Sequence, residues 1–352
     1  TAVVEVIKEL DTLELEDRLK DRRIAITAGS RGIHNIDRIV KSVVDYVKAR
    51  GGHPFIVPAM GSHGGATAEG QREVIRGYGI DEATMGCPVL SSMEVVHLGT
   101  AANGAPVYFD KNAYEADGVI VVNRVKPHTD FSAANESGLV KMIAIGLGKE
   151  KGCSAMHANG LAASIPASAA VSLEKAPILC GLAVVENSRD HTFLLKAVRR
   201  EDFLAEDARL LKLSYSLVPH LPVDSLDLLV VKEIGKIFSG TGMDTKTIGR
   251  IRVRGVEEPV QRAAVVDDQI FDDIDAVDML RQIIQRNRKR LALLLGESDC
   301  LSVAVKVFNL NDVAALDTAE AGDLVFTAGE SALDGAHGID EGIGTRAACE
   351  NV

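Results

Sequence analysis

Short apolar segments alternate with amphipathic segments along the first half of the chain. Residues 23–27 (RIAIT), 54–59 and 117–123 (DGVIVVN) are apolar runs, the last strongly β-branched, and such runs are typical of buried strands. Between the first two runs, apolar residues recur with the 3.6-residue spacing of a helix that ends at two glycines. The residues of that helical pattern are Ile36, Ile39, Val40, Val43, Val44 and Val47, followed by Gly51 and Gly52.

The same alternation continues toward the carboxyl terminus. Thr67 is a plausible N-cap for a helix that ends near Arg76. Further strands are predicted at 182–185, 227–231, 290–295 and 302–308, and further helices at 199–212 and 273–285. Strands that alternate with helices predict an α/β protein with mostly parallel strands and right-handed crossovers.

The length of 352 residues predicts two domains, each large enough to bury a core. Pro219 and Pro222 interrupt the pattern within residues 216–223, after a charged helix. We therefore expect an N-terminal α/β domain over residues 1–219 and a C-terminal α/β domain over residues 220–352, with an active-site cleft between them.

Composition excludes several classes of partner. A net charge of −11 without a Lys/Arg-rich run argues against nucleic-acid binding. No apolar run approaches the roughly 20 residues of a membrane span. The five cysteines are scattered without a C-x-x-C pair, which argues against a disulfide framework and favours a reducing compartment. With no basic-then-apolar leader visible at the start, we expect a cytoplasmic protein.

Ionisable residues follow four of the predicted strands. Arg31 comes after the first strand, His63 after the second in a Gly-Ser-His-Gly-Gly turn, and His128 after the third. Glu233 and Lys236 follow the strand at 227–231. Open α/β sheets bind ligands in the crevice beyond the carboxyl ends of their strands. The sequence therefore predicts a site at this edge.

Residues 123–157 contain a concentration of reactive side chains. His128, Lys141 and His157 lie there within a Gly- and Ser-rich segment. Imidazoles transfer protons or bind metals near neutral pH, and a lysine among apolar neighbours is uncommon unless it is paired or reactive. Each residue also has a purely structural interpretation, with His63 bonded to nearby backbone and His157 a satisfied helix histidine.

Other chemistries have weaker marks. Gly146-x-Gly148-x-x-x-Gly152 is one residue off the dinucleotide fingerprint, and the chain has no phosphate loop, H-E-x-x-H or G-x-S-x-G motif. Three alternatives stay open. They are an NAD-dependent 2-hydroxy acid oxidoreductase that uses this glycine turn and His128, a zinc enzyme with His63, His128 and His157 as ligands, and a non-catalytic binding module.

The ordered motifs over about residues 20–250 resemble the lactate racemase family, whose members are isomerases that use a nickel-pincer nucleotide. The resemblance rests on Gly61-Ser62-His63, on His128 with the downstream Gly-Leu-Val-Lys141-Met, and on Ala-Met-His157, sixteen residues beyond that lysine. Arg31, and Lys236 three residues after Glu233, extend it.

The resemblance implies a role for each matched residue. Lys141 would hold the cofactor, pyridinium-3-thioamide-5-thiocarboxylic acid mononucleotide with nickel, through a thioamide, and His157 would be the protein ligand to nickel. His63 and His128 would transfer protons on opposite faces of the substrate. Ser137 and Gly138 would help cradle the cofactor phosphate.

The resemblance also implies a positively charged pocket and different roles for the two domains. Arg31 and Lys236 would supply positive charge for the substrate carboxylate or the cofactor phosphate, and Glu233 would also contact substrate. Residues 1–219 would carry the cofactor and proton-transfer residues, and residues 220–352 would close the cleft.

The implied reaction is racemisation or epimerisation of a 2-hydroxy acid by reversible hydride transfer to a cofactor that separate synthesis proteins make. Ala28 stands where the lactate enzymes carry an acid, Glu233 replaces an expected amide, and the chain has no tryptophan. We therefore expect a substrate other than lactate, such as a larger hydroxy acid or a sugar acid.

Overall fold

The protein is described here by a computed structural model that places residues 2–129, 131–219, 228–231, 264–265, 291–294 and 305–308. The chain divides into two compact units, Thr1–Val218 and Pro219–Val352, and each is described by itself. The roles that we assign to residues 1–219 and 220–352, and the cleft expected between them, stay predictions.

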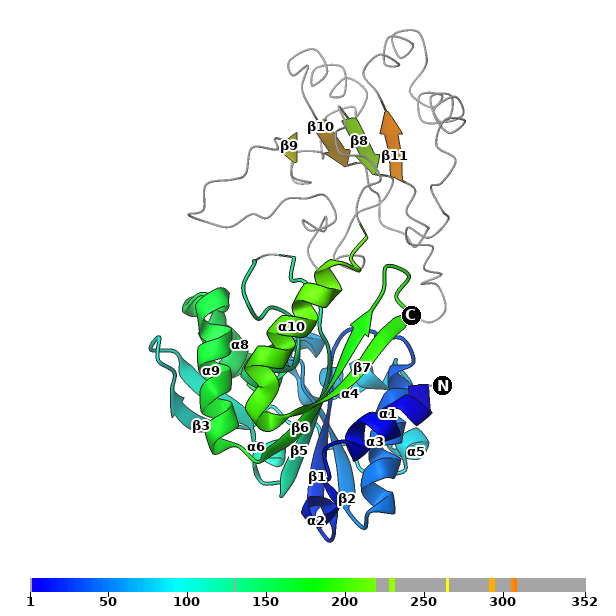
Figure 1. The fold of residues 1–352 in the computed structure, drawn as a ribbon. Helices are drawn as coiled ribbons and strands as arrows, with labels where there is room; N and C mark the ends of the chain where they lie inside the picture. The colour runs from blue at the N-terminus through cyan, green and yellow to red at the C-terminus, as the bar shows by residue number, and fades with distance from the viewer. Residues whose placement is uncertain are drawn as a thin grey trace. The chain divides into compact units, whose positions relative to one another are not determined.

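The first unit is built around a five-stranded sheet in the order β2-β1-β5-β6-β7 (Figure 1). Its strands are β1 (Arg23–Ala28), β2 (His53–Pro58), β5 (Gly118–Arg124), β6 (Ile178–Glu186) and β7 (Thr192–Arg199). The first four strands are mutually parallel, and only β7 runs antiparallel to its neighbour in this sheet. The predicted α/β fold class with a mostly parallel sheet is confirmed.

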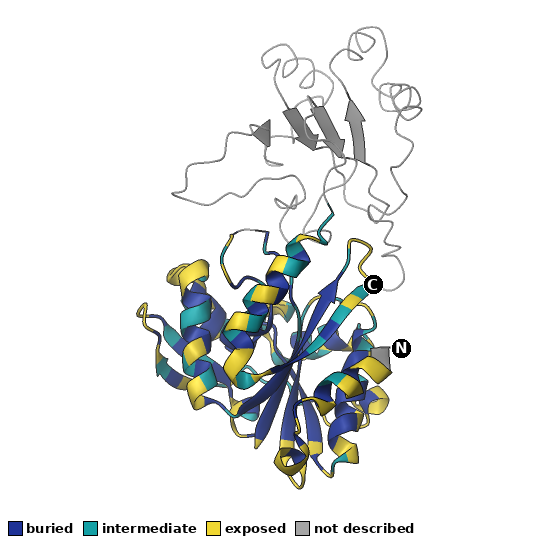
Figure 2. Cartoon of the chain, viewed as in Figure 1, coloured by how far each residue is buried: buried dark blue, intermediate teal, exposed yellow. Residues whose placement is uncertain are grey.

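Successive residues of the central strands face two different cores. In β5, Val119 and Val121 lie in one hydrophobic cluster, whereas Ile120 and Val122 lie in the other. Because side chains alternate across a strand, a sheet that is covered on both faces needs apolar residues at every position. Figure 2 shows the result as strands that are buried along most of their length.

Helices cover the two faces. In Figure 1, α1 and α3 lie on one side of the sheet and α8, α9 and α10 on the other. The helices of the first unit are α1 (Ala2–Asp11), α2 (Glu16–Leu19), α3 (Ile36–Ala49), α4 (Ala68–Arg76), α5 (Glu82–Met85), α6 (Lys111–Tyr114), α7 (Leu139–Lys141), α8 (Lys149–Ala158), α9 (Leu161–Lys175) and α10 (Phe203–Tyr215). The predicted N-cap is confirmed, since Thr67 Oγ1 accepts a hydrogen bond from the Gly70 N–H at 3.0 Å.

Two features of the first unit differ from the sequence prediction. The helix expected from residue 199 begins at Phe203, because residues 192–199 form β7 and a short 3₁₀ turn follows. An unpredicted hairpin of β3 (Val95–Thr100) and β4 (Pro106–Asp110) forms a separate antiparallel pair.

The second unit contains a four-stranded sheet in the order β11-β8-β10-β9. Its strands are β8 (Leu228–Val231), β9 (Ala264–Val265), β10 (Leu291–Leu294) and β11 (Val305–Phe308), and β11 is antiparallel to β8. Three of these strands fall within predicted ones. The helix expected at 273–285 lies outside the described residues. No helix in the described part of the chain is long and apolar enough to cross a membrane.

Candidate active site

The order of the strands places three predicted loops side by side. β1 is flanked by β2 on one side and by β5 on the other, so successive crossovers leave β1 in opposite directions. A ligand crevice forms at the carboxyl ends of strands where the order reverses in this way. Arg31, His63 and His128 follow β1, β2 and β5 respectively, and therefore lie at this edge.

The His63 turn contacts the turn that carries Arg31. A hydrogen bond joins the His63 Nδ1 atom to the Ser30 hydroxyl, and both His63 and Arg31 are exposed. Gly64 and Gly65 follow with left-handed φ angles of 66° and 63°, a conformation that glycine adopts without steric cost. The glycines therefore let the chain fold back sharply behind the imidazole.

Lys141 ends α7, and the chain continues as a π-helical segment, η2 (Met142–Gly146), before α8. This segment packs against both turns. The Gly61 N–H donates to the Gly146 carbonyl oxygen at 3.2 Å, and a Cβ atom on Gly29 would lie 3.2 Å from the Met142 methyl carbon. The half-buried Lys141 is therefore part of the same region as Arg31 and His63, and π-helical turns recur at functional sites.

The His128 loop is fixed by a buried carboxylate. Glu136 Oε2 accepts a hydrogen bond from the His128 N–H at 2.6 Å, and Glu136 Oε1 accepts one from the Tyr215 hydroxyl at 2.8 Å. The rings of His128 and Phe131 pack with their centroids 4.4 Å apart. These contacts tie the loop after β5 to α10 and set the position of the imidazole.

Ser137 and Gly138 directly precede α7, and Asp207 of α10 packs against this point. Ser137 pairs with Lys126 through two backbone hydrogen bonds, and the Leu139 N–H donates to Asp207 Oδ1 at 2.8 Å. A Cβ atom on Gly138 would come within 2.1 Å of the same oxygen, so only glycine fits there. The structure gives Gly138 a packing role, and the predicted phosphate contact of both residues stays a prediction.

Burial raises the pKa of Asp207 to about 6, although hydrogen bonds from the Leu139 and Val140 N–H groups and from Asn135 oppose the shift. A carboxyl with a raised pKa binds its proton in the folded state first, so it adds stability as pH falls from about 6 toward its ordinary 3.8. We expect wild type to gain about 2 kcal/mol over Asp207→Asn between pH 7.5 and pH 4. Urea unfolding of both proteins at the two pH values measures this, and a constant difference would contradict it.

His157 lies in the last turn of α8 and is exposed. It follows Cys153 by four residues, so the two side chains share one face of the helix. Cys153 Sγ lies 3.5 Å from the Ser62 hydroxyl, next to His63. The face of α8 that presents His157 therefore borders the His63 turn.

The structure does not support the sequence patterns behind two of the alternatives, the zinc enzyme and the NAD-dependent oxidoreductase. In the described part of the chain, no group of three His, Cys, Asp or Glu side chains is placed to hold a metal ion, so His63, His128 and His157 do not form a zinc site by themselves. Gly146 ends η2 and Gly148 precedes α8, whereas a dinucleotide fingerprint opens a helix directly after a strand. A Cβ atom on Gly146 would lie 2.6 Å from Met142 Sδ, which indicates a packing role.

Sequence reasoning missed the buried polar residues that support these loops. They are Gln71, Asp110, Glu136, Lys149 and Asp207. Each acts through a partner far along the chain, so neither motif nor periodicity indicates it. Glu233 and Lys236, which were predicted to contact substrate, lie outside the described residues.

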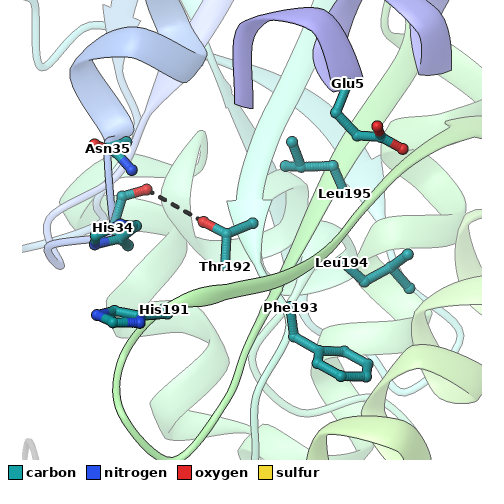
Figure 3. Close-up of a pocket in the computed structure, with 8 residues that line it drawn as sticks. All are labelled: Glu5, His34, Asn35, His191, Thr192, Phe193, Leu194 and Leu195. Carbon is teal, nitrogen blue, oxygen red and sulfur yellow. Dashed lines mark hydrogen bonds between the residues drawn. The ribbon is translucent and has the colours of Figure 1, made fainter. Parts of the chain in front are cut away.

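A surface hollow lies beside α1 and β7 (Figure 3). It is lined by Glu5, His34, Asn35, His191, Thr192, Phe193, Leu194 and Leu195, and it includes none of the predicted site residues. The His34 and His191 rings lie 4.8 Å apart, and the His34 N–H donates to Glu186 at 2.6 Å.

A mostly parallel sheet with ionisable loops at its switch point defines an α/β protein with a candidate binding site at the carboxyl ends of the strands. Residues 9–168 match the lactate racemase N-terminal domain family, and they include every predicted site residue except Glu233 and Lys236. This stretch of the chain is therefore similar to a lactate racemase N-terminal domain.

Comparison with solved structures finds the lactate racemase apoprotein from Thermoanaerobacterium thermosaccharolyticum, at 17% identity and a TM-score of 0.48. The match covers 65% of this chain and 58% of that chain, which is less than two thirds of the racemase. No curated protein matches the chain.

Proposed function

We propose that the protein is a racemase or epimerase of a 2-hydroxy acid that uses a lysine-tethered nickel-pincer nucleotide. The observation that carries the proposal is the packing of three segments into one region. The His63 turn is hydrogen-bonded to the turn of Arg31 through Ser30, and through Gly61 to Gly146 in η2, the segment that directly follows Lys141. The match to the lactate racemase N-terminal domain supports the same assignment.

The residues present fit this cofactor. Lys141 is half-buried at the end of α7 and supplies an amine for a covalent link. His157 is exposed on the face of α8 that borders the His63 turn, and no hydrogen bond joins its side chain to another described residue. Nickel accepts imidazole beside sulfur donors in tetragonal geometry, so one histidine suffices when the cofactor brings its own sulfurs.

The protein's own groups would bind the acid and move its hydroxyl proton. When bound, the cofactor would supply the hydride chemistry at the α-carbon. Arg31 pairs with the substrate carboxylate or the cofactor phosphate. His63, held by Ser30 through Nδ1, takes or gives the hydroxyl proton through Nε2 on one side, and His128 does so on the other. Two bases are needed because the two enantiomers present their hydroxyl groups to opposite sides.

The expected substrate is a 2-hydroxy acid other than lactate. Ala28, at the end of β1, replaces the acid that the sequence resemblance leads us to expect near Arg31. The change shortens the side chain at this position and removes a negative charge. We infer that the difference changes which acid is accepted, and we expect a larger acid or a sugar acid.

The test is an enantiomer-interconversion assay in deuterated water on protein produced together with the cofactor-synthesis proteins. The substrates tested run from lactate to larger hydroxy acids and sugar acids, and chiral chromatography measures the interconversion of each. We expect a larger acid to interconvert faster than lactate, with its α-hydrogen retained because a hydride leaves and returns. Turnover that requires added NAD would instead support the oxidoreductase, and no interconversion of any acid would overturn the proposal.

Replacing His157 by alanine should lower nickel retention while leaving the covalent adduct on Lys141. The imidazole contributes one bond to the metal, whereas the amine carries the organic part. Nickel content after dialysis against a chelator, measured beside intact mass, tests this. Equal nickel in wild type and variant would remove His157 from the assignment, and His191→Ala serves as a control for an exposed histidine elsewhere.

A further inference from the structure

A fully buried lysine lies behind the His63 turn. Lys149, the first residue of α8, is completely inaccessible to solvent, and three oxygen atoms surround its ammonium group. Nζ lies 3.2 Å from Asp110 Oδ2 and 3.0 Å from Gln71 Oε1, and it also donates to the Pro58 carbonyl oxygen. The ammonium group therefore donates hydrogen bonds to Pro58 and Gln71, and it pairs with Asp110 as an ion pair in which Oδ2 accepts no hydrogen bond from a described residue.

Gln71 connects this lysine to the turn. Its side chain is also fully buried, and its Nε2 donates to the Gly61 carbonyl oxygen at 2.8 Å and to the His63 carbonyl oxygen at 3.2 Å. The two ends of one carboxamide therefore contact the lysine and the two sides of the turn. Because Gln71 lies on α4 and Lys149 lies on α8, the carboxamide connects these two helices to the His63 turn.

The lysine fixes which way the carboxamide points. Lys149 can only donate, so it selects the amide oxygen of Gln71 and directs the NH₂ group toward the turn. Without a donor there, the amide could rotate by half a turn and place its oxygen against the two carbonyl oxygens. Asp110 balances the charge of Lys149, and its Oδ1 accepts a hydrogen bond from the Ala113 N–H at 2.9 Å.

Burial disfavours both charges, and it raises the pKa of Asp110 and lowers the pKa of Lys149, while their mutual attraction opposes each shift. A buried ion pair of this kind is weak evidence for added stability, because well-packed apolar residues in its place often give an equally stable protein. The Lys149–Asp110 pair is better suited to hold the backbone in one arrangement, because its contacts are directional.

We propose that Gln71, oriented by the Lys149–Asp110 pair, is a positioning residue that holds the His63 imidazole where it meets the substrate. The effect of Gln71 on catalysis rests on the proposed function, whereas its effect on the position of the His63 imidazole does not. A side chain misplaced by about 1 Å can cost about 100-fold in rate. The network thus acts through the backbone of Gly61 and His63, and it does not touch substrate.

Gln71→Met removes both ends of the carboxamide at similar volume, and Lys149→Met combined with Asp110→Asn removes the orienting group without leaving a buried charge. We expect each change to lower kcat about 100-fold with KM and cofactor loading unchanged. Ser42→Ala, which removes a buried hydroxyl on α3 outside the network, is the matched control and should leave kcat as in wild type.

Nitrogen-15 NMR of the histidine rings gives a readout that needs no cofactor. The His63 resonances, assigned with His63→Gln, should move in both network variants, whereas those of His34 and His97 should not. In wild type, the Gln71 carboxamide protons should exchange slowly with solvent. Unmoved His63 resonances in a folded variant, or fast exchange of those protons in wild type, would overturn the proposal.

These experiments distinguish failure of the positioning role from failure of the proposed function. If the His63 resonances move while wild type interconverts no hydroxy acid, the positioning contact stands and the proposed function fails. If wild type is active and folded Gln71→Met keeps its full kcat, the proposed function stands and the positioning role fails.

Discussion

His63→Ala and His128→Ala should each lower turnover by about 1,000-fold while the cofactor stays attached. Both imidazoles lie on loops whose backbone is held by other groups. The Gly61 and His63 carbonyl oxygens accept hydrogen bonds from Gln71, and the His128 N–H donates to Glu136. Truncation at Cβ therefore removes the proton-transfer group and leaves each loop in place.

Steady-state kinetics in both reaction directions, with intact mass as the measure of loading, tests this prediction. His97→Ala is the matched control, because His97 lies on β3, away from the three loops. Retention of turnover within about tenfold in either site variant would show that the residue is not a general acid or base. Loss of the adduct in either variant would assign it to cofactor binding instead.

Asp110→Ala should cost about 3–5 kcal/mol of unfolding free energy, because it leaves the ammonium of Lys149 buried without its counter-charge. Loss of the hydrogen bond that Asp110 accepts from the Ala113 N–H in the first turn of α6 adds to the effect. Urea unfolding near neutral pH measures the change. Lys149→Met in the Asp110→Asn background should recover much of the stability, since that double variant buries no charge.

An exposed ion pair provides the comparison. On α3, Lys41 Nζ lies 2.5 Å from Asp45 Oδ1, and the two side chains are 40% and 53% exposed. Asp45→Ala should therefore cost only a small fraction of the unfolding free energy that Asp110→Ala costs. Equal costs for Asp45→Ala and Asp110→Ala would contradict the account of a buried charge pair.

The sequence predicted the parallel part of the sheet because each strand there is buried on both faces. An unbroken apolar run such as residues 117–123 follows directly from that burial. β7 escaped prediction because it is an antiparallel edge strand in which exposed and buried residues mix, and the charged residues after it suggested a helix. The β3–β4 hairpin carries partly exposed residues with a bulge between His97 and Gly99, so its pattern is weak.

Some residues of the candidate site were likewise predictable from the sequence, and others were not. Arg31, His63 and His128 were predictable because they directly follow strands, where α/β folds place ligands. Gln71 and Lys149 were not, because their contact joins residues 78 positions apart and depends on how α4 packs against α8. The contact between Glu136 and Tyr215 spans 79 positions for the same reason. Local patterns therefore indicated the groups proposed to react, and the fold was needed to find the groups that hold them.

The most direct test of the proposed function is the intact mass and nickel content of wild type and Lys141→Ala, each produced with the cofactor-synthesis proteins. Lys41→Ala is the control, because Lys41 lies on α3 in an exposed ion pair with Asp45. We expect a mononucleotide-sized mass increment with nickel on wild type and Lys41→Ala, and none on Lys141→Ala. An unmodified wild-type chain, from a host that loads a known lactate racemase, would contradict it.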